Sequence, residues 1–123
     1  MNVDRFFIYS KEFRSSIIGI GRDLTISREG TSRTNSFDTA FECISGFPYN
    51  LIILDASKDE TMALVDQLEK SGRFVYRECS RPKISVVENG NFDLVDRLRS
   101  QYPSLNFFKC KKWGTDIYDV GLY

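Results

Sequence analysis

The spacing of apolar residues predicts a strand and then a helix at the start of the chain. Residues 5–10 (RFFIYS) form a short aromatic and β-branched run, which favours an extended conformation. Residues 11–23 carry apolar side chains at a spacing closer to that of a helix, so we expect a helix there. We expect a second short strand at residues 24–27 and a polar loop at residues 30–35.

A second helix and a central strand follow this loop. Ser36 is a good N-cap, and Gly46 with Pro48 should end the helix that it begins. Residues 51–54 (LIIL) are continuously apolar and lead into Asp55. An uninterrupted apolar run of this length is typical of a parallel strand that is covered on both faces.

The second half of the chain continues the alternation of helices and strands. Its expected elements are a helix capped by Asp59 and closed by Gly72, a strand at residues 84–87, a helix that begins after Asn89 or Asn91 and stops at Pro103, a strand at residues 105–110, and a short or irregular last helix within residues 111–123. Residues 74–82 fit either an extra strand or an extended connection. The alternation predicts one α/β domain over residues 1–123, with an open, doubly wound, parallel sheet of five strands.

Composition narrows the classes of partner. The chain of 123 residues carries 17 basic and 17 acidic residues, so its charge gives no reason to expect direct nucleic-acid binding. The longest strongly apolar run, at residues 51–54, is far too short to cross a membrane, and the first residues lack the apolar core of a signal peptide. We therefore expect a cytoplasmic protein without membrane contact.

The chemistry-bearing residues exclude several kinds of site. Histidine is absent, which removes the commonest general base and the commonest transition-metal ligand. The three cysteines, Cys43, Cys79 and Cys110, are widely spaced and odd in number, which argues against a disulfide framework and against a zinc site. We expect no enzymatic activity, no cofactor and no bound metal.

The candidate site lies where the parallel strands end. In an open parallel sheet, ligands bind at the carboxyl ends of the strands, next to the point where the strand order reverses. The residues at these ends are Ser10, Lys11, Asp55, Val87, Glu88, Lys109 and Cys110. Asp55 and Lys109 stand out because a carboxylate and a cation lie at the ends of two of these strands.

The chain resembles the receiver domain of bacterial two-component response regulators, which has a flavodoxin-like fold. The resemblance extends to about Cys110 and is carried by LIILDAS, with Asp55 in the place of the phospho-acceptor, and by FFKC, with Lys109 in the place of the conserved lysine. It implies that an acidic pair after the first strand would hold Mg²⁺ beside the acceptor, and that a hydroxyl after the fourth strand would meet the phosphoryl group.

Three of the five functional positions depart from that pattern. Ser10 and Lys11 replace the acidic pair, and Lys11 precedes Asp55 by 44 positions, in agreement with the spacing of the family. The hydroxyl position falls on Val87 or Glu88, and Cys110 stands where a proline usually follows the lysine. We expect Lys11 to lie where Mg²⁺ would otherwise bind and to pair with Asp55, so that Asp55 is not efficiently phosphorylated.

The leading hypothesis is therefore a degenerate receiver that acts as a phosphorylation-independent interaction module in signalling or transcription control. The resemblance implies a protein partner, and homodimerisation as a further expectation, through the face formed by the fourth helix and fifth strand. The residues expected on that face are Phe92, Leu98, Phe108 and Trp113.

Two other functions and one structural interpretation stay open at this point. The chain could be a phospho-accepting receiver that completes its metal site with Asp4, Glu12 or Glu88. It could also be a flavodoxin-like binder of a small ligand, although the turn after the first strand has no glycine to let a phosphate approach. Asp55 could simply cap the turn that follows its strand.

Overall fold

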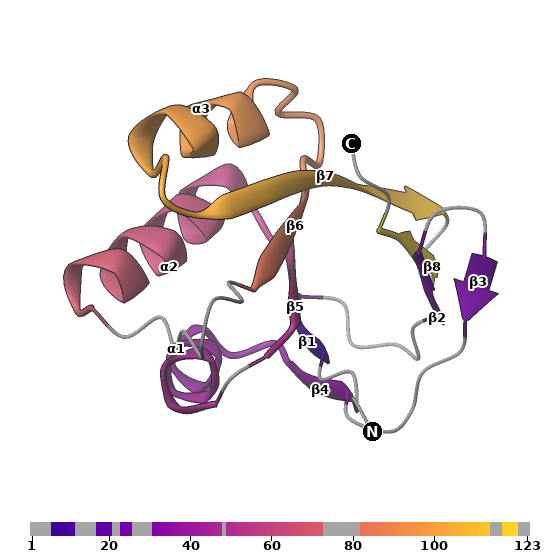
Figure 1. Cartoon of the computed structure of the whole chain (residues 1–123), viewed down its shortest axis with the longest axis horizontal. Helices are drawn as coiled ribbons and strands as arrows, with labels where there is room; N and C mark the ends of the chain where they lie inside the picture. Colours follow the sequence, from indigo (N-terminus) through magenta and orange to yellow (C-terminus); the bar gives the residue numbers. More distant parts are fainter. Residues whose placement is uncertain are drawn as a thin grey trace.

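The computed structural model describes residues 6–11, 17–20, 23–25, 31–47, 49–72, 82–113 and 117–120. These residues form one eight-stranded sheet and three helices (Figure 1). In chain order the elements are β1 (Phe6–Ser10), β2 (Ile17–Ile20), β3 (Asp23–Thr25), β4 (Thr31–Thr34), α1 (Phe37–Gly46), β5 (Leu51–Asp55), α2 (Lys58–Lys70), β6 (Lys83–Val87), α3 (Leu94–Gln101), β7 (Asn106–Trp113) and β8 (Ile117–Asp119).

The sheet is parallel over five neighbouring strands and changes character at one end. Its order is β3-β2-β8-β7-β6-β5-β1-β4. Every pair from β4 to β7 is parallel, whereas β7 pairs with β8, and β2 with β3, in antiparallel fashion. The expectation of an α/β fold with a mostly parallel sheet is confirmed, but the sheet has eight strands in place of five.

Two of the three described helices, α1 and α2, begin after a serine that caps them. The Ser36 hydroxyl accepts a hydrogen bond from the Thr39 N–H at 3.4 Å, and the Ser57 hydroxyl accepts one from the Glu60 N–H at 3.2 Å. Asp59, which was expected to cap α2, lies in its first turn instead, where its negative charge still favours the helix. Gly72 follows α2 at φ 65°, the left-handed conformation that glycine adopts without strain. No helix in the described part of the chain is long and apolar enough to span a bilayer.

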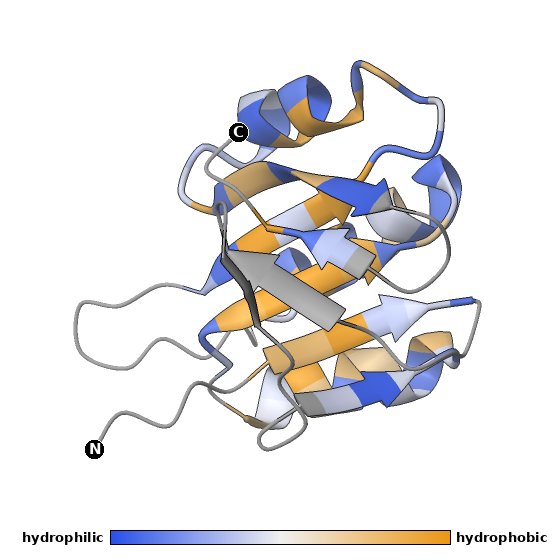
Figure 2. Cartoon of the chain, turned by 90° about the vertical axis from the view of Figure 1, so that its right-hand side faces the viewer, coloured by the Kyte–Doolittle hydropathy of each residue, from blue (hydrophilic) through white to orange (hydrophobic). Residues whose placement is uncertain are grey.

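The sheet has two differently covered faces. Phe7, Tyr9, Ile52 and Leu54 belong to a core that includes apolar residues of all three helices. The alternate residues of the same strands form a second core with Tyr118 and Val120. Accordingly, the helices lie on one side of the five parallel strands, and the sheet curls so that β8, β2 and β3 lie on the other side (Figure 1). The hydrophobic stretches of the parallel strands lie between them (Figure 2).

Strand order explains this division. The crossovers through α1, α2 and α3 all step along the sheet in one direction, and right-handed connections then place their helices on one face. β1 is followed by β4 in the opposite direction, so its connection belongs to the other face. The sheet therefore reverses its order between β1 and β5, beside Ser10 and Asp55.

The helix expected at residues 11–23 was wrong, because the described residues there form β2 and β3. Ile17, Ile18 and Ile20 are β-branched and surround Gly19, a combination that disfavours a helix. β2 pairs both with β3, which follows it in the chain, and with β8, and the second of these is a long-range pairing that no local pattern reveals.

Two further predictions in the same layers were wrong. The strand beside β1 is β4, inside the expected loop at residues 30–35, whereas the strand expected at residues 24–27 overlaps β3 at the far end of the sheet. The short helix expected after residue 111 is replaced by the end of β7 and by β8. Of residues 74–82, only Pro82 belongs to the described residues, so that prediction lies outside them.

Candidate functional site

Asp55 ends β5 at the point where the sheet reverses its order. It is paired in register with Ser10 of β1, while Val87 of β6 is paired with Cys110 of β7 at the same end of the sheet. Only 5% of Asp55 is exposed. A carboxylate taken this far out of water requires hydrogen-bond donors and a cation nearby.

Four side chains supply those donors, and together with Asp55 they form the Asp55 cluster. Oδ2 of Asp55 accepts hydrogen bonds from the Tyr118 hydroxyl at 2.7 Å, from the Lys112 ammonium at 2.7 Å and from the Ser10 hydroxyl at 3.4 Å. Oδ1 accepts one from the Asn89 side-chain amide at 3.0 Å. Both oxygens of the carboxylate are thus engaged by groups of the chain itself.

The electrostatics of the cluster keep Asp55 ionised. Burial alone would raise the pKa of Asp55, but the hydrogen bonds from Lys112, Asn89 and Tyr118 and the charge of Lys112 lower it below its ordinary value. Burial, together with the nearby Asp55 carboxylate, raises the pKa of Tyr118, so its hydroxyl stays a proton donor. The Lys112 ammonium also lies 5.7 Å from the centre of the Tyr118 ring, within the range of a cation–π contact.

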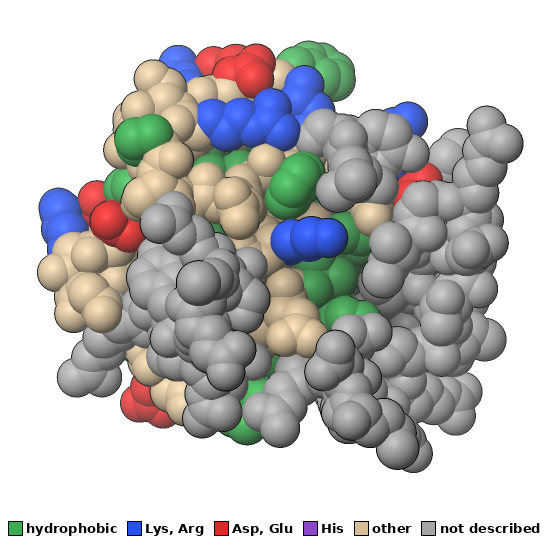
Figure 3. All heavy atoms as spheres, in the orientation of Figure 1, with side chains coloured by type: hydrophobic (Ala, Val, Ile, Leu, Met, Phe, Trp, Pro, Cys, Tyr) green, Lys and Arg blue, Asp and Glu red, His purple; other side chains and the backbone are tan. Residues whose placement is uncertain are grey.

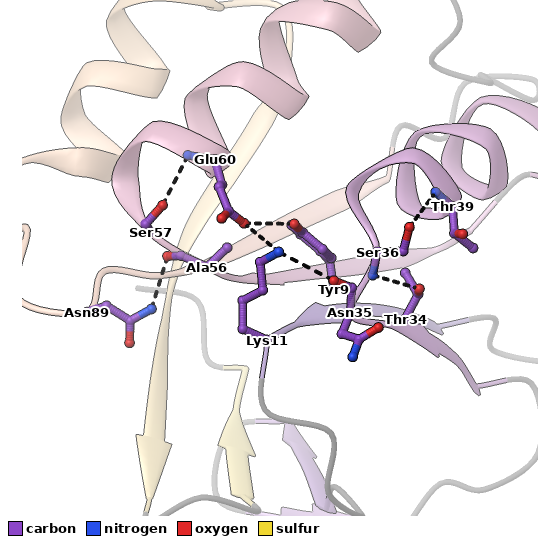
Figure 4. Close-up of polar contacts among 10 residues, drawn as sticks. All are labelled: Tyr9, Lys11, Thr34, Asn35, Ser36, Thr39, Ala56, Ser57, Glu60 and Asn89. Atoms are coloured by element: carbon purple, nitrogen blue, oxygen red, sulfur yellow. Dashed lines mark hydrogen bonds and ion pairs between the residues drawn. The ribbon is translucent and has the colours of Figure 1, made fainter.

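Asn89 connects the cluster to the loop before α3. Its side-chain amide donates both to Asp55 and, at 3.1 Å, to the carbonyl oxygen of Ala56, a contact visible in Figure 4. Asn89 has φ 48°, a left-handed conformation that asparagine tolerates better than most residues. Gly90 follows at φ 87°, so a tight turn directs the asparagine side chain back to the end of β5.

The cation beside Asp55 is Lys112, not Lys109. Side chains alternate along β7, so Lys109 shares the helix-covered face with Phe107, whereas Lys112 shares the other face with Cys110. Lys109 is half-exposed and lies 4.0 Å from Glu88. Sequence reasoning missed Lys112 because it ended this strand at Cys110; continuing the alternation to Trp113 would have placed Lys112 on the face of Asp55.

Lys11 does not pair with Asp55, contrary to expectation. Its ammonium lies 3.3 Å from Oε2 of Glu60, donates to the carbonyl oxygen of Asn35 at 3.4 Å and lies 5.6 Å from the centre of the Tyr9 ring. Glu60 also accepts a hydrogen bond from the Tyr9 hydroxyl at 2.8 Å (Figure 4). These contacts lie on the helix-covered side, because Tyr9 belongs to that core and Glu60 to α2.

The remaining strand-end residues have structural environments. Val87 is buried in the core beneath β8. Glu88 accepts a hydrogen bond from the Val95 N–H at 3.4 Å and so serves the N-terminus of α3. Burial beside Asp55 and Asp119 raises the pKa of the Cys110 thiol to about 12, which makes it a poor nucleophile near neutral pH.

Only some residues of the expected partner face are accessible. Phe92 is 83% exposed and Phe108 is partly buried, but Leu98 is fully buried in the helix-side core and cannot contact a partner. The side chain of Trp113 lies outside what the structure describes. On the face shown in Figure 3, the described hydrophobic side chains are interspersed with charged and polar ones.

The described residues contain no group of three or more cysteine, aspartate or glutamate side chains that could hold a metal ion. No family model, curated protein or solved structure matches this chain. Its function therefore has to be argued from the fold and from the contacts of Asp55.

Proposed function

We propose that this protein is a phosphorylation-independent regulatory module that works by binding a protein partner and catalyses no reaction. Two features support its resemblance to receiver domains. Numbered alone along the chain, the five parallel strands have the order 2-1-3-4-5, which is the flavodoxin-like order. Asp55 ends the third of these strands, at the reversal point where such folds bind their ligands.

The observation that carries the proposal is the engagement of the Asp55 carboxylate. A phospho-accepting aspartate has to present an oxygen lone pair to phosphorus while Mg²⁺ neutralises the incoming charge. Here Lys112 and Tyr118 both contact Oδ2 at 2.7 Å, and Asn89 contacts Oδ1. Charge-assisted hydrogen bonds of this length are strong. They stabilise the negative charge of the carboxylate and so make its oxygens weaker nucleophiles toward phosphorus.

The neighbouring positions also oppose a metal ion. Ser10 contributes a hydroxyl that donates to Asp55, and the ammonium of Lys112 brings positive charge where Mg²⁺ would need anionic oxygen ligands. Glu88, which could have completed a metal site, instead contacts α3 and Lys109. The contacts at this site thus favour a fixed structural ion pair over a reversible phosphorylation site.

Function then depends on the surface. The strongest candidate for a partner contact is Phe92, which is exposed before α3 in a loop that Asn89 ties to Asp55. Large aromatic residues are common anchors at protein interfaces. We propose that a protein partner binds at this end of α3. In the homodimer, that partner would be a second copy of the chain bound through the same residue.

The experiment is exposure of the purified chain to acetyl phosphate and Mg²⁺, followed by measurement of the intact mass. The control is the Asp55→Asn variant, which keeps the shape of the side chain but cannot form an acyl phosphate. We expect no phosphorylated species in either protein. Mg²⁺-dependent phosphorylation of the wild type that is absent from the Asp55→Asn variant would overturn the proposal.

A further inference from the structure

The Asp55 cluster joins the parallel part of the sheet to the end of β7 and to β8. We define the C-terminal arm as residues 111–113 of β7 together with residues 117–120. Up to Cys110, β7 pairs with β6, whereas from Lys111 onward it pairs with β8. The arm therefore leaves the parallel part of the sheet at one position, and β2 is the only other described strand to which β8 is hydrogen-bonded.

The arm grips Asp55 with a cross-strand pair. Lys112 and Tyr118 are direct partners in the β7–β8 ladder, and both donate to Oδ2 of Asp55 at 2.7 Å. Opposed residues on two antiparallel strands move together, so the two donors approach or leave the carboxylate as a unit. Lys112 is 18% exposed, whereas Asp55 is 5% exposed. The contact between Lys112 and Asp55 therefore lies at the edge of a buried region.

The face of the sheet that the arm covers is apolar, but it contains one buried hydroxyl without a hydrogen-bond partner among the described residues. Tyr118 and Val120 of the arm cover the second core, which includes Ile8, Ile53 and Val87. In the middle of that face, the hydroxyl of Ser85 is fully buried and has no hydrogen-bond partner among the described residues. Such a group costs free energy in the closed structure, because burial removes its hydrogen bonds to water.

We propose that the Asp55 cluster is a latch, in which Lys112 and Tyr118 hold the C-terminal arm closed over the second face of the sheet. Removing the grip lets the arm open locally while the parallel strands remain folded. The inference rests on the proposed function only for the consequence of opening, which is exposure of the second core as a further apolar contact for the partner that binds at Phe92. Binding of the partner would then be coupled to release of Asp55.

The test is amide hydrogen exchange of the full chain, measured residue by residue by NMR, without Mg²⁺ or a phosphate donor. The variants are Lys112→Met and Tyr118→Phe, and the control is Lys109→Met, which changes a lysine of the same strand on the opposite face. Loss of one hydrogen bond to a buried charge should increase opening by about tenfold to a hundredfold. In both variants we expect the β8 amides to exchange faster by that factor through an opening that depends little on urea, while the β5 amides still exchange more slowly and only through the urea-dependent unfolding of the whole domain.

Two results would overturn the latch. Exchange of β8 and β5 at the same rate and with the same urea dependence would show that the arm opens only when the whole domain unfolds, and unchanged exchange of β8 would show that Lys112 and Tyr118 do not hold the arm closed. Tyr118→Phe keeps the buried ring, so it carries the test if the Lys112 variant does not fold. Because no phosphate donor is present, phosphorylation of Asp55 in the separate mass measurement would refute the proposed function and leave this result intact.

Discussion

Replacing Lys112 by methionine removes the cation from Asp55 while keeping a side chain of similar length. Removing one partner of a buried ion pair costs about 3–5 kcal/mol, because the other charge stays buried. In this cluster, Asp55 keeps its hydrogen bonds from Tyr118 and Asn89, and Lys112 is 18% exposed, so water can replace part of the lost interaction. We therefore expect a loss of about 2–3 kcal/mol in the free energy of unfolding.

The measurement is urea unfolding followed by circular dichroism. Lys109→Met is the matched control, since it removes the same charge from the same strand where the side chain is half-exposed and 4.0 Å from Glu88. Its effect should stay within about 0.5 kcal/mol of the wild type. If the Lys112 variant loses no more stability than this control, Asp55 does not depend on Lys112 and the interpretation of the cluster is refuted.

A double-mutant cycle then isolates the pair itself. Asp55→Asn removes the negative charge, and the double variant with Lys112→Met removes both charges. Residues in direct contact should show a coupling energy of about 1–3 kcal/mol, so the double variant should be more stable than the sum of the single losses implies. Additive losses would mean that the 2.7 Å contact contributes no interaction energy.

Further predictions concern the partner face and acid stability. Leu98→Asp should unfold the domain, because it places an unpaired carboxylate in the helix-side core. Phe92→Ser changes an exposed residue and should alter the free energy of unfolding by no more than about 0.5 kcal/mol. A Leu98→Asp variant that stays stable in urea unfolding would contradict the assigned core. The folded-state pKa of Asp55 is lowered, so its contribution to stability is present above the unfolded-state pKa and is lost as pH falls through the folded value. Acid titration of wild type and Asp55→Asn should therefore show the larger loss in the wild type below about pH 4, and parallel curves would contradict this assignment.

The central part of the fold could be predicted because local patterns decide it. Four apolar residues before Asp55 indicate a buried strand, and Ser36 followed by apolar residues at helical spacing indicates the start of α1; both are correct. These elements depend on neighbours in sequence: a cap, a turn or a period of apolar positions. Such local signals do not depend on which distant segments the chain brings together.

The second face could not be predicted, because its elements depend on partners far away in sequence. Residues 17–20 form a strand that lies between β3 and β8, and Thr31–Thr34 form one through pairing with β1 despite a polar, loop-like sequence. Strand formation depends strongly on such context, whereas helix propensity is more local. Those pairings explain why strands are found on this face where a helix over residues 11–23 was expected.

The position of Asp55 at the end of a central strand could be predicted, but the cation that contacts it could not. Asp55 lies at the reversal point, as the alternation of elements indicated. The prediction that Lys11 is its counter-ion was wrong, because Lys11 contacts Glu60 on the helix-covered side. Lys109 failed because successive side chains of β7 alternate between the two faces of the sheet, which places Lys109 on the face opposite Lys112. Lys112 was missed because the expected strand ended at Cys110 and so did not include it.

The most direct test of the central claim is a titration with beryllofluoride and Mg²⁺, followed through the backbone amide signals of the full chain by NMR. Beryllofluoride binds aspartate as a mimic of the phosphoryl group, so it reports whether the carboxylate and a metal ion can meet. With Asp55 held by Lys112, Tyr118 and Asn89, we predict no saturable shift in the signals of Ser10, Ala56 or Asn89. Saturable, Mg²⁺-dependent shifts at these residues that disappear in Asp55→Asn would contradict the account.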